Sequence, residues 1–191
     1  TDSGRNYIDG NDLGTGYAML AAAWFSAAYP DKRVRFINRG IGGNRISDLR
    51  ARWQRDCLDL RPVWVSILIG INDTWRRYDS NDPVPVGAFE RDYRAILTAL
   101  RDRLRARLII CEPFLLPVPD DRIAWREDLD PKIAVVRRLA REFEAIYVPL
   151  DGLFAAAAMR REPAFWLPDG VHPTPAGHAL IAQSWLSAVG A

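Results

Sequence analysis

Residues 63–69 read VWVSILI and are followed by Gly70-Ile71-Asn72-Asp73. The run is apolar almost throughout and rich in β-branched side chains, which is typical of a strand buried on both faces of a parallel sheet. Gly70 ends the strand, so the polar residues after it fall at the carboxyl end. This stretch predicts an α/β protein whose polar loops gather at one edge of a sheet.

Strands and helices alternate on both sides of this stretch. Other strands are predicted at residues 33–38, 108–114 and 145–150, and helices at residues 17–29, 46–60 and 89–104, from residue 130 onward, and at the C-terminal end. Asp130-Pro131 and Thr174-Pro175 each resemble an N-cap followed by proline at the first helical position. The alternation predicts one domain over residues 1–191, an α/β/α sandwich with a mainly parallel central sheet.

Composition excludes several classes of protein. The chain is 49% hydrophobic and 26% charged, with a net charge of +2, which argues against nucleic-acid binding. No apolar run approaches the roughly 18 residues of a membrane span, so no membrane partner is expected. Cys57 and Cys111 stand alone, which predicts two buried thiols and neither a metal site nor a disulfide framework. No cofactor is expected, and a reducing compartment, the cytoplasm, is favoured.

Residues 167–174, LPDGVHPT, place His172 three residues after Asp169. Glycine and proline fix a turn here, and a turn can bring a carboxylate to an imidazole. Such a pair suits a general base, because the carboxylate holds one ring nitrogen and leaves the other to take a proton. The alternative is a capped turn with a solvated histidine. His178, in the first turn of the last helix, is interpreted as a surface or helix-dipole residue.

Three loops are predicted at the carboxyl ends of strands: residues 40–44, residues 70–75 and residues 169–172. They bring a glycine-rich backbone, a carboxamide and the Asp169–His172 pair to one edge of the sheet. Only a nucleophile is lacking for an acyl-transfer site.

These blocks resemble the SGNH hydrolases, also called GDSL-type esterases, in order and over nearly the whole chain. The resemblance implies a flavodoxin-like fold and a serine hydrolase that cleaves carboxylic esters through an acyl-enzyme. It implies that His172 is the general base and that Asp169 orients it. Gly43 and Asn72 would donate hydrogen bonds to the oxyanion, and no metal is implied.

The nucleophile block departs from the family pattern. Thr1-Asp2-Ser3-Gly4-Arg5 matches the tail of that block, so the serine is expected just upstream of Thr1. Ser3 is the alternative nucleophile. The family's first strand, which precedes the serine, is also missing from residues 1–191, and its loss would leave interior backbone groups unpaired at about 1–3 kcal/mol each. We therefore expect that strand and serine to precede Thr1.

The form of the motifs is most similar to family members that remove acetyl groups from carbohydrates, such as acetylated xylo-oligosaccharides. A small ester, with an acetylated oligosaccharide as the favoured case, is the expected partner. Trp75 and Trp166 flank two of the loops and are candidates for substrate contacts, with core packing as the alternative. A general short-chain esterase or thioesterase and a non-catalytic carbohydrate-binding relative stay open, as do the exact ester and assembly into a homo-oligomer.

Overall fold

The computed structural model of the chain describes residues 1–9 and 11–191. Within these residues a parallel sheet is formed by β1 (Trp64–Leu68), β2 (Arg107–Cys111) and β3 (Ile146–Val148), in the order β1-β2-β3. The register places Ser66, Ile109 and Ile146 side by side across the three strands. The predicted parallel α/β architecture is confirmed.

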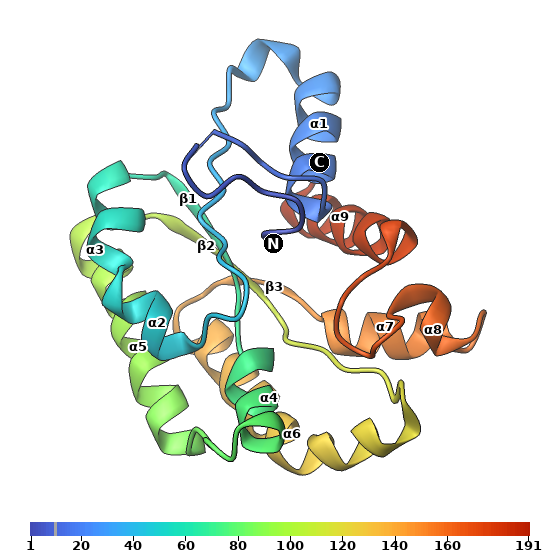
Figure 1. Ribbon diagram of the computed structural model, residues 1–191. Coiled ribbons are helices and arrows are strands. Elements are labelled where there is room, and N and C mark those ends of the chain that lie inside the picture. Colours follow the sequence, from blue (N-terminus) through green and yellow to red (C-terminus); the bar gives the residue numbers. More distant parts are fainter. Residues whose placement is uncertain (10) are drawn as a thin grey trace.

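Helices connect the strands and follow the last of them (Figure 1). The α-helices of the described residues are α1 (Tyr17–Ala28), α2 (Ile46–Ala51), α3 (Trp53–Asp56), α4 (Ile71–Asp79), α5 (Val86–Arg103), α6 (Arg126–Glu142), α7 (Leu150–Ala158), α8 (Pro163–Trp166) and α9 (Pro175–Val189). Short 3-10 helices are η1 (Pro30–Lys32), η2 (Leu58–Leu60) and η3 (Asp120–Trp125). Helix α4 begins directly after Gly70, at the carboxyl side of β1, so the loop predicted at residues 70–75 was wrong: residues 71–75 belong to this helix.

Two hydrophobic cores cover the two faces of the sheet. Leu108 and Ile110 of β2 pack into a core with α2, α3, α5 and α6. Ile109 and Cys111, which alternate with them along the strand, pack into a second core with α1, α7 and α9. Figure 1 shows α1 and α9 lying together on one side and α2 and α5 on the other. The result is a three-layer sandwich.

Two predictions about strands were wrong. β1 is less buried than its sequence suggests, with Trp64 39% exposed, because among the described residues it pairs on one side only, with β2. Residues 33–38 alternate like a strand but carry no strand in the structure. A strand requires a hydrogen-bonded neighbour, and no described strand pairs with this segment.

Two helix boundaries also differ. The helix predicted over residues 46–60 is broken at Arg52 into α2 and α3, where the Arg52 side chain donates to the Arg39 carbonyl and to Asn44 Oδ1. The start predicted at Asp130-Pro131 lies inside α6, which begins at Arg126. Pro131 is in the second turn, where it removes one helical hydrogen bond. The start at Thr174-Pro175 is confirmed, and Thr174 Oγ1 accepts from the Gly177 N–H.

Cys57 and Cys111 are free and buried, as predicted. Burial raises the pKa of both thiols to about 12, so neither forms a thiolate near neutral pH. None of the helices in the described part of the chain combines the length and the apolar character that crossing a membrane requires.

Candidate active site

The turn between α8 and α9 brings Asp169 and His172 together. His172 Nδ1 lies 2.6 Å from Asp169 Oδ2, and the other carboxylate oxygen accepts from the backbone N–H groups of His172 at 2.8 Å and Val171 at 3.2 Å. Gly170 between them has φ +85°, and a Cβ there would lie 2.5 Å from the Leu116 carbonyl oxygen. Only glycine fits this position, and its carbonyl accepts from the Leu116 N–H.

These contacts fix the charge and the tautomer of the pair. Partial burial acts to raise the pKa of Asp169, but the hydrogen bonds from the His172 ring and from two backbone N–H groups outweigh it, and the pKa is lowered. An ionised carboxylate accepts only, so Nδ1 of His172 carries the proton and donates. Nε2 is left as the basic nitrogen of a ring whose side chain is 71% exposed. The pair can therefore accept a proton from an approaching hydroxyl.

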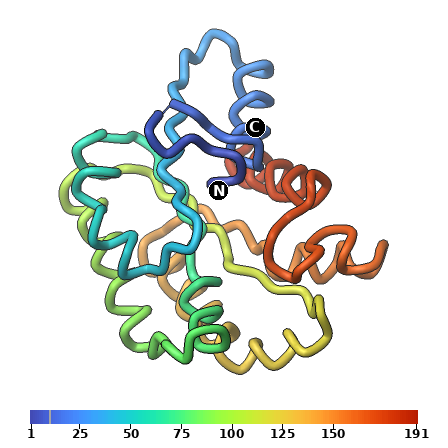
Figure 2. The backbone as a smooth tube through the Cα atoms, in the orientation of Figure 1, coloured from blue at the N-terminus to red at the C-terminus, as the bar shows by residue number. Residues whose placement is uncertain are grey.

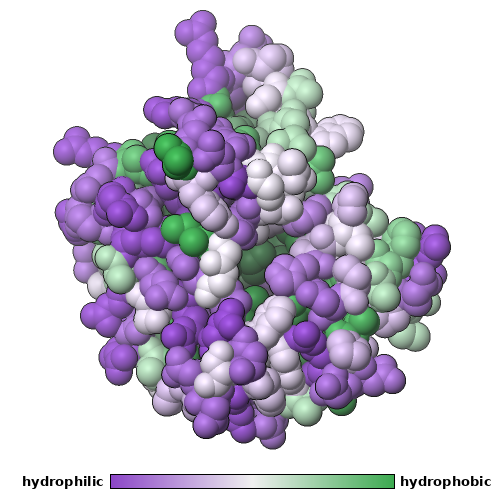
Figure 3. Space-filling model, viewed as in Figure 1, coloured by the Kyte–Doolittle hydropathy of each residue, from purple (hydrophilic) through white to green (hydrophobic). Residues whose placement is uncertain are grey.

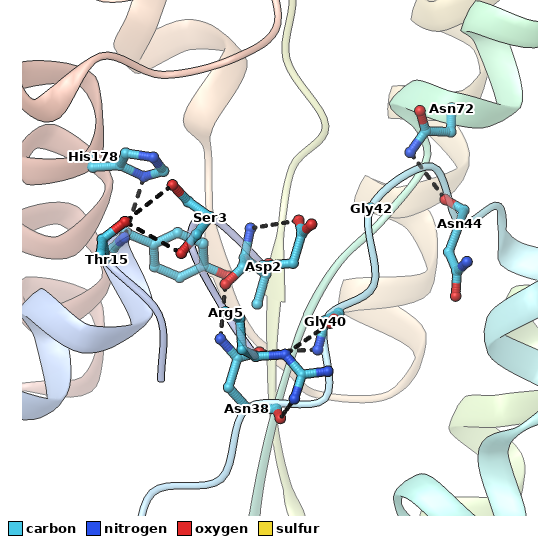
Figure 4. Close-up of polar contacts among 12 residues, drawn as sticks. Asp2, Ser3, Arg5, Thr15, Asn38, Gly40, Gly42, Asn44, Asn72 and His178 are labelled. Atoms are coloured by element: carbon cyan, nitrogen blue, oxygen red, sulfur yellow. Dashed lines mark hydrogen bonds and ion pairs between the residues drawn. The ribbon is translucent and has the colours of Figure 1, made fainter. Parts of the chain in front are cut away.

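Asn72 and the glycine-rich loop form a second part of the site. Asn72 lies in the first turn of α4, and its Nδ2 donates to the Asn44 carbonyl at 3.1 Å (Figure 4). The neighbouring Gly43 has φ +76°, and a Cβ there would meet nothing closer than Arg76 Nη2 at 3.9 Å. The glycine is thus required by its backbone conformation rather than by lack of space. The hydrogen bond places Asn72 beside this loop.

Trp75 links the two parts. It follows Asn72 by three residues on α4, so the two side chains share a helix face. The Trp75 and His172 rings are 5.6 Å apart between centroids. The structure therefore gathers Asp169, His172, Asn72 and Gly43 at the carboxyl-end edge of the sheet, and Trp75 lies beside His172.

Asp73 of α4 binds the backbone at the start of α2, which follows the glycine loop. It is fully buried, and each carboxylate oxygen is 3.2 Å from the Ile46 nitrogen, the first residue of α2. Burial raises the pKa of Asp73 to about 7, against the opposing effects of the Ile46 N–H and of Lys132. Because Ile46 follows Gly43 by three residues, this contact fixes the position of the glycine loop relative to Asn72.

Trp166 is partly buried, and it is not among the aromatic side chains that contact Trp75 in the described residues. It packs against the hydrophobic residues between the sheet and α9, and its carbonyl accepts from the Thr174 N–H.

The interpretation of His178 as a surface residue was wrong. His178 is 8% exposed, and its Nδ1 accepts from the Tyr17 N–H at the start of α1. The turn before α1 packs on the His178 ring, and sequence spacing alone does not reveal this contact.

Ser3, the alternative nucleophile, lies apart from the predicted site. Its Oγ is 3.5 Å from Thr15 Oγ1, and Figure 4 shows it beside Thr15 and His178, with Asn72 on the far side of Asp2. The N-terminal residues run beside the start of α1 (Figure 2), where Thr1 Oγ1 lies 2.9 Å from the Tyr17 hydroxyl. The Thr1 carbonyl accepts from Asn38 Nδ2 at 2.8 Å. These contacts hold Thr1 against Tyr17 and Asn38.

An aromatic cluster beside His172 was not predicted from the sequence. Trp125 of η3 lies 5.5 Å from Trp75 and stacks on Tyr78 of α4 at 5.0 Å. Tyr78 follows Trp75 by three residues, a spacing that places both aromatic rings on one face of a helix. The position of η3, and so of Trp125, depends on a long loop and cannot be inferred from spacing. On the face in Figure 3, hydrophobic surface lies recessed at the centre between hydrophilic parts.

Comparisons with known proteins identify the family of this chain. The model of the GDSL-like lipase/acylhydrolase family matches residues 3–180, and the chain belongs to that family. It is 33% identical to an acetylxylan esterase from Geobacillus stearothermophilus, over 100% of this chain and 90% of the relative. A crystal structure of such an esterase from that organism superimposes with a TM-score of 0.92, at 33% identity and with the same coverage.

A second solved structure extends the comparison. An alpha/beta hydrolase enzyme from the metagenome of Lake Arreo, Spain, superimposes with a TM-score of 0.91 at 32% identity, over 100% of this chain and 90% of that one. The fold is thus the SGNH fold that the resemblance implied, and the chain is an ester-hydrolysing serine hydrolase.

Proposed function

We propose that this hydrolase removes short acyl groups, with acetyl as the preferred group, from carbohydrate esters through an acyl-enzyme. The observation that carries the proposal is the 2.6 Å contact between His172 Nδ1 and Asp169 Oδ2. His172 also lies against Trp75, which shares helix α4 with Asn72. The acetylxylan esterase relative supports the acetyl group and the carbohydrate.

In the proposed reaction a serine hydroxyl attacks the ester carbonyl and gives its proton to Nε2 of His172. Asp169 holds the ring and stabilises its charged form, and His172 then returns the proton to the leaving alcohol. The backbone N–H of Gly43 and Nδ2 of Asn72 donate to the oxyanion, where one such donor contributes about 3–4 kcal/mol. Water then cleaves the acyl-enzyme by the same proton transfers in reverse order.

The proposed serine lies just upstream of Thr1, at the end of a strand that completes the sheet. Two features support this placement. β1 has a free edge among the described residues, and residues 33–38 run without a strand partner there. The Thr1 carbonyl also accepts from Asn38 Nδ2, and Thr1 lies next to Gly40 of the glycine loop. Ser3 is the less suitable nucleophile because it faces Thr15 and His178.

The test is a serine-directed organophosphonate applied to the full-length protein, followed by peptide mass spectrometry. We expect an adduct on a serine upstream of Thr1 and parallel loss of activity toward acetylated xylo-oligosaccharides. An adduct on Ser3 would overturn the placement. Faster hydrolysis of acyl thioesters than of sugar acetates would overturn the proposed substrate class while leaving the serine mechanism in place.

A further inference from the structure

The Arg122 guanidinium lies over the rings of both Trp75 and Trp125, beside the candidate active site. Its Cζ lies 4.1 Å from the ring centroid of Trp125 and 4.8 Å from that of Trp75. Tyr78 covers the Trp125 ring with its plane only 6° away from parallel. A cation over aromatic faces is stabilised there, so the guanidinium has a fixed position.

Neighbouring arginines are neutralised by carboxylates, and Arg122 differs from them. Arg77 pairs with Glu127 at 2.7 Å, and Arg126 pairs with Asp151 at 2.7 Å. Nη1 of Arg122, by contrast, is buried without a hydrogen-bond partner in residues 1–9 and 11–191. Leaving a buried donor unsatisfied costs about 1–3 kcal/mol, so such groups in native proteins call for an explanation. The Arg122 side chain also lines an open hollow, so a ligand oxygen can approach the guanidinium from that side.

A hollow of about 340 Å³ lies at the same place. It is lined by Tyr78, Pro119, Asp121, Arg122, Ala124 and Trp125. An aromatic wall with a few polar groups is the usual composition of a small-molecule site of this size. Asp121 accepts hydrogen bonds and Arg122 donates them, which suits neighbouring hydroxyl groups, because each hydroxyl both donates and accepts. A ligand carboxylate would face the like charge of Asp121.

The hollow is close enough to the reacting groups to bind the same substrate molecule. The ring of Trp75 contacts both groups. Its centroid lies 5.6 Å from that of His172 and 5.5 Å from that of Trp125. A substrate whose ester lies at His172 would therefore extend over Trp75 toward Arg122 when it is longer than one sugar ring.

We propose that Arg122, fixed by Trp75 and Trp125 and assisted by Asp121, binds hydroxyl groups of an oligosaccharide substrate beyond the acetylated sugar. This inference rests on the proposed function, because it assigns the part of the site that distinguishes oligosaccharides from small acetate esters. Arg122 makes no contact with the reacting atoms and acts on specificity.

The test compares Arg122→Met with the wild-type full-length protein on two substrates. Methionine keeps apolar contact with the rings and removes the donors. The matched control is Arg107→Met, since Arg107 also lies over a tryptophan, Trp64, at 4.5 Å but at the start of β2, away from the site. Initial rates are measured with 4-nitrophenyl acetate and with acetylated xylotriose.

We expect Arg122→Met to raise KM for acetylated xylotriose about tenfold, as for loss of a hydrogen bond to a charged group. Its kcat/KM for 4-nitrophenyl acetate should stay within about twofold, and Arg107→Met should change neither substrate. Equal losses on both substrates, or no loss on either, would overturn the proposal. A larger loss on a xylo-oligosaccharide bearing a uronic acid than on the neutral one would overturn hydroxyl recognition in favour of carboxylate recognition.

The two proposals fail in different ways. If the wild-type protein hydrolyses 4-nitrophenyl acetate but not acetylated xylotriose, the carbohydrate substrate is wrong. Binding of unacetylated xylotriose, measured by calorimetry, then decides the Arg122 site by itself: wild-type binding that Arg122→Met abolishes supports it, and absence of binding overturns it.

Discussion

Asn72 on α4 donates from Nδ2 to the carbonyl of Asn44, 3.1 Å away in the glycine loop. A single hydrogen bond thus joins the two elements that carry the proposed oxyanion donors. Its donor atom is the one that the proposed mechanism assigns to the oxyanion, so in that mechanism the carboxamide both positions the loop and donates to the substrate.

Replacing Asn72 by alanine should reduce kcat toward 4-nitrophenyl acetate by about 10²- to 10³-fold, because an oxyanion donor is lost. The free energy of unfolding should fall by only about 1 kcal/mol, the usual contribution of one hydrogen bond. Steady-state kinetics and urea denaturation measure the two effects. A loss of kcat below tenfold in a folded variant would remove Asn72 from the proposed oxyanion site.

Replacing Asp169 by asparagine should lower kcat by about 10⁴-fold while the turn is retained. Asparagine can still accept from the N–H groups of Val171 and His172, but it no longer holds the Nδ1–H tautomer or stabilises the charged ring. The measurement is kcat with thermal unfolding as the control for folding. Near wild-type kcat would show that the 2.6 Å contact has no role in proton transfer.

Asp73 should make the protein less stable as the pH rises from about 4 to about 7. Burial raises the pKa of the folded-state carboxyl to about 7, above its ordinary value of 3.8. The folded protein therefore holds a proton that the unfolded chain has lost, and the contribution to stability present below pH 4 is lost by about pH 7. The slope is at most roughly 1.4 kcal/mol per pH unit.

Asp73→Asn provides the matched comparison, since its Oδ1 can still accept from the Ile46 N–H. Urea denaturation at several pH values should show that the variant lacks this decline. Identical pH dependence in both proteins would mean that Asp73 does not titrate between pH 4 and pH 7.

His178 should have the opposite effect on the acid side. Burial lowers its pKa from 6.5 to about 4, so the unfolded chain binds a proton in a range where the folded protein does not. Its contribution to stability is complete above pH 6.5 and is lost as the pH falls to about 4. His178→Asn keeps an acceptor for the Tyr17 N–H and should flatten the dependence between pH 4 and pH 6.5. A profile unchanged by the substitution would contradict this assignment.

The sequence was informative where local rules decide structure. The strand predicted at residues 108–114 and the helix start at Thr174-Pro175 rest on local patterns: the helix start is confirmed, and the strand is present as β2, Arg107–Cys111. The start of α6 was misplaced because Pro131 is tolerated near a helix start, beyond the first position. The burial of β1 could not be predicted, since it depends on which strands pair with it.

The residues of the candidate site also divide into those that a local pattern predicts and those whose positions depend on tertiary packing. Asp169 and His172 are three residues apart, so their pairing follows from one turn. Gly43 and Asn72 were recognised through their motifs, while their contact depends on the packing of α4 against the glycine loop. Arg122 and Trp125 were missed, because η3 meets α4 through tertiary contacts that no sequence period records.

The pair of Asp169 and His172 also has a mechanical consequence. Both residues lie in one turn, which is tied to its surroundings by the bond from the Leu116 N–H to the Gly170 carbonyl and by that from the Thr174 N–H to the Trp166 carbonyl. Any displacement of the turn therefore carries the carboxylate and the imidazole together. Such motion changes the distance from the imidazole to its nucleophile but not the contact between Asp169 and His172, which belongs to the turn itself.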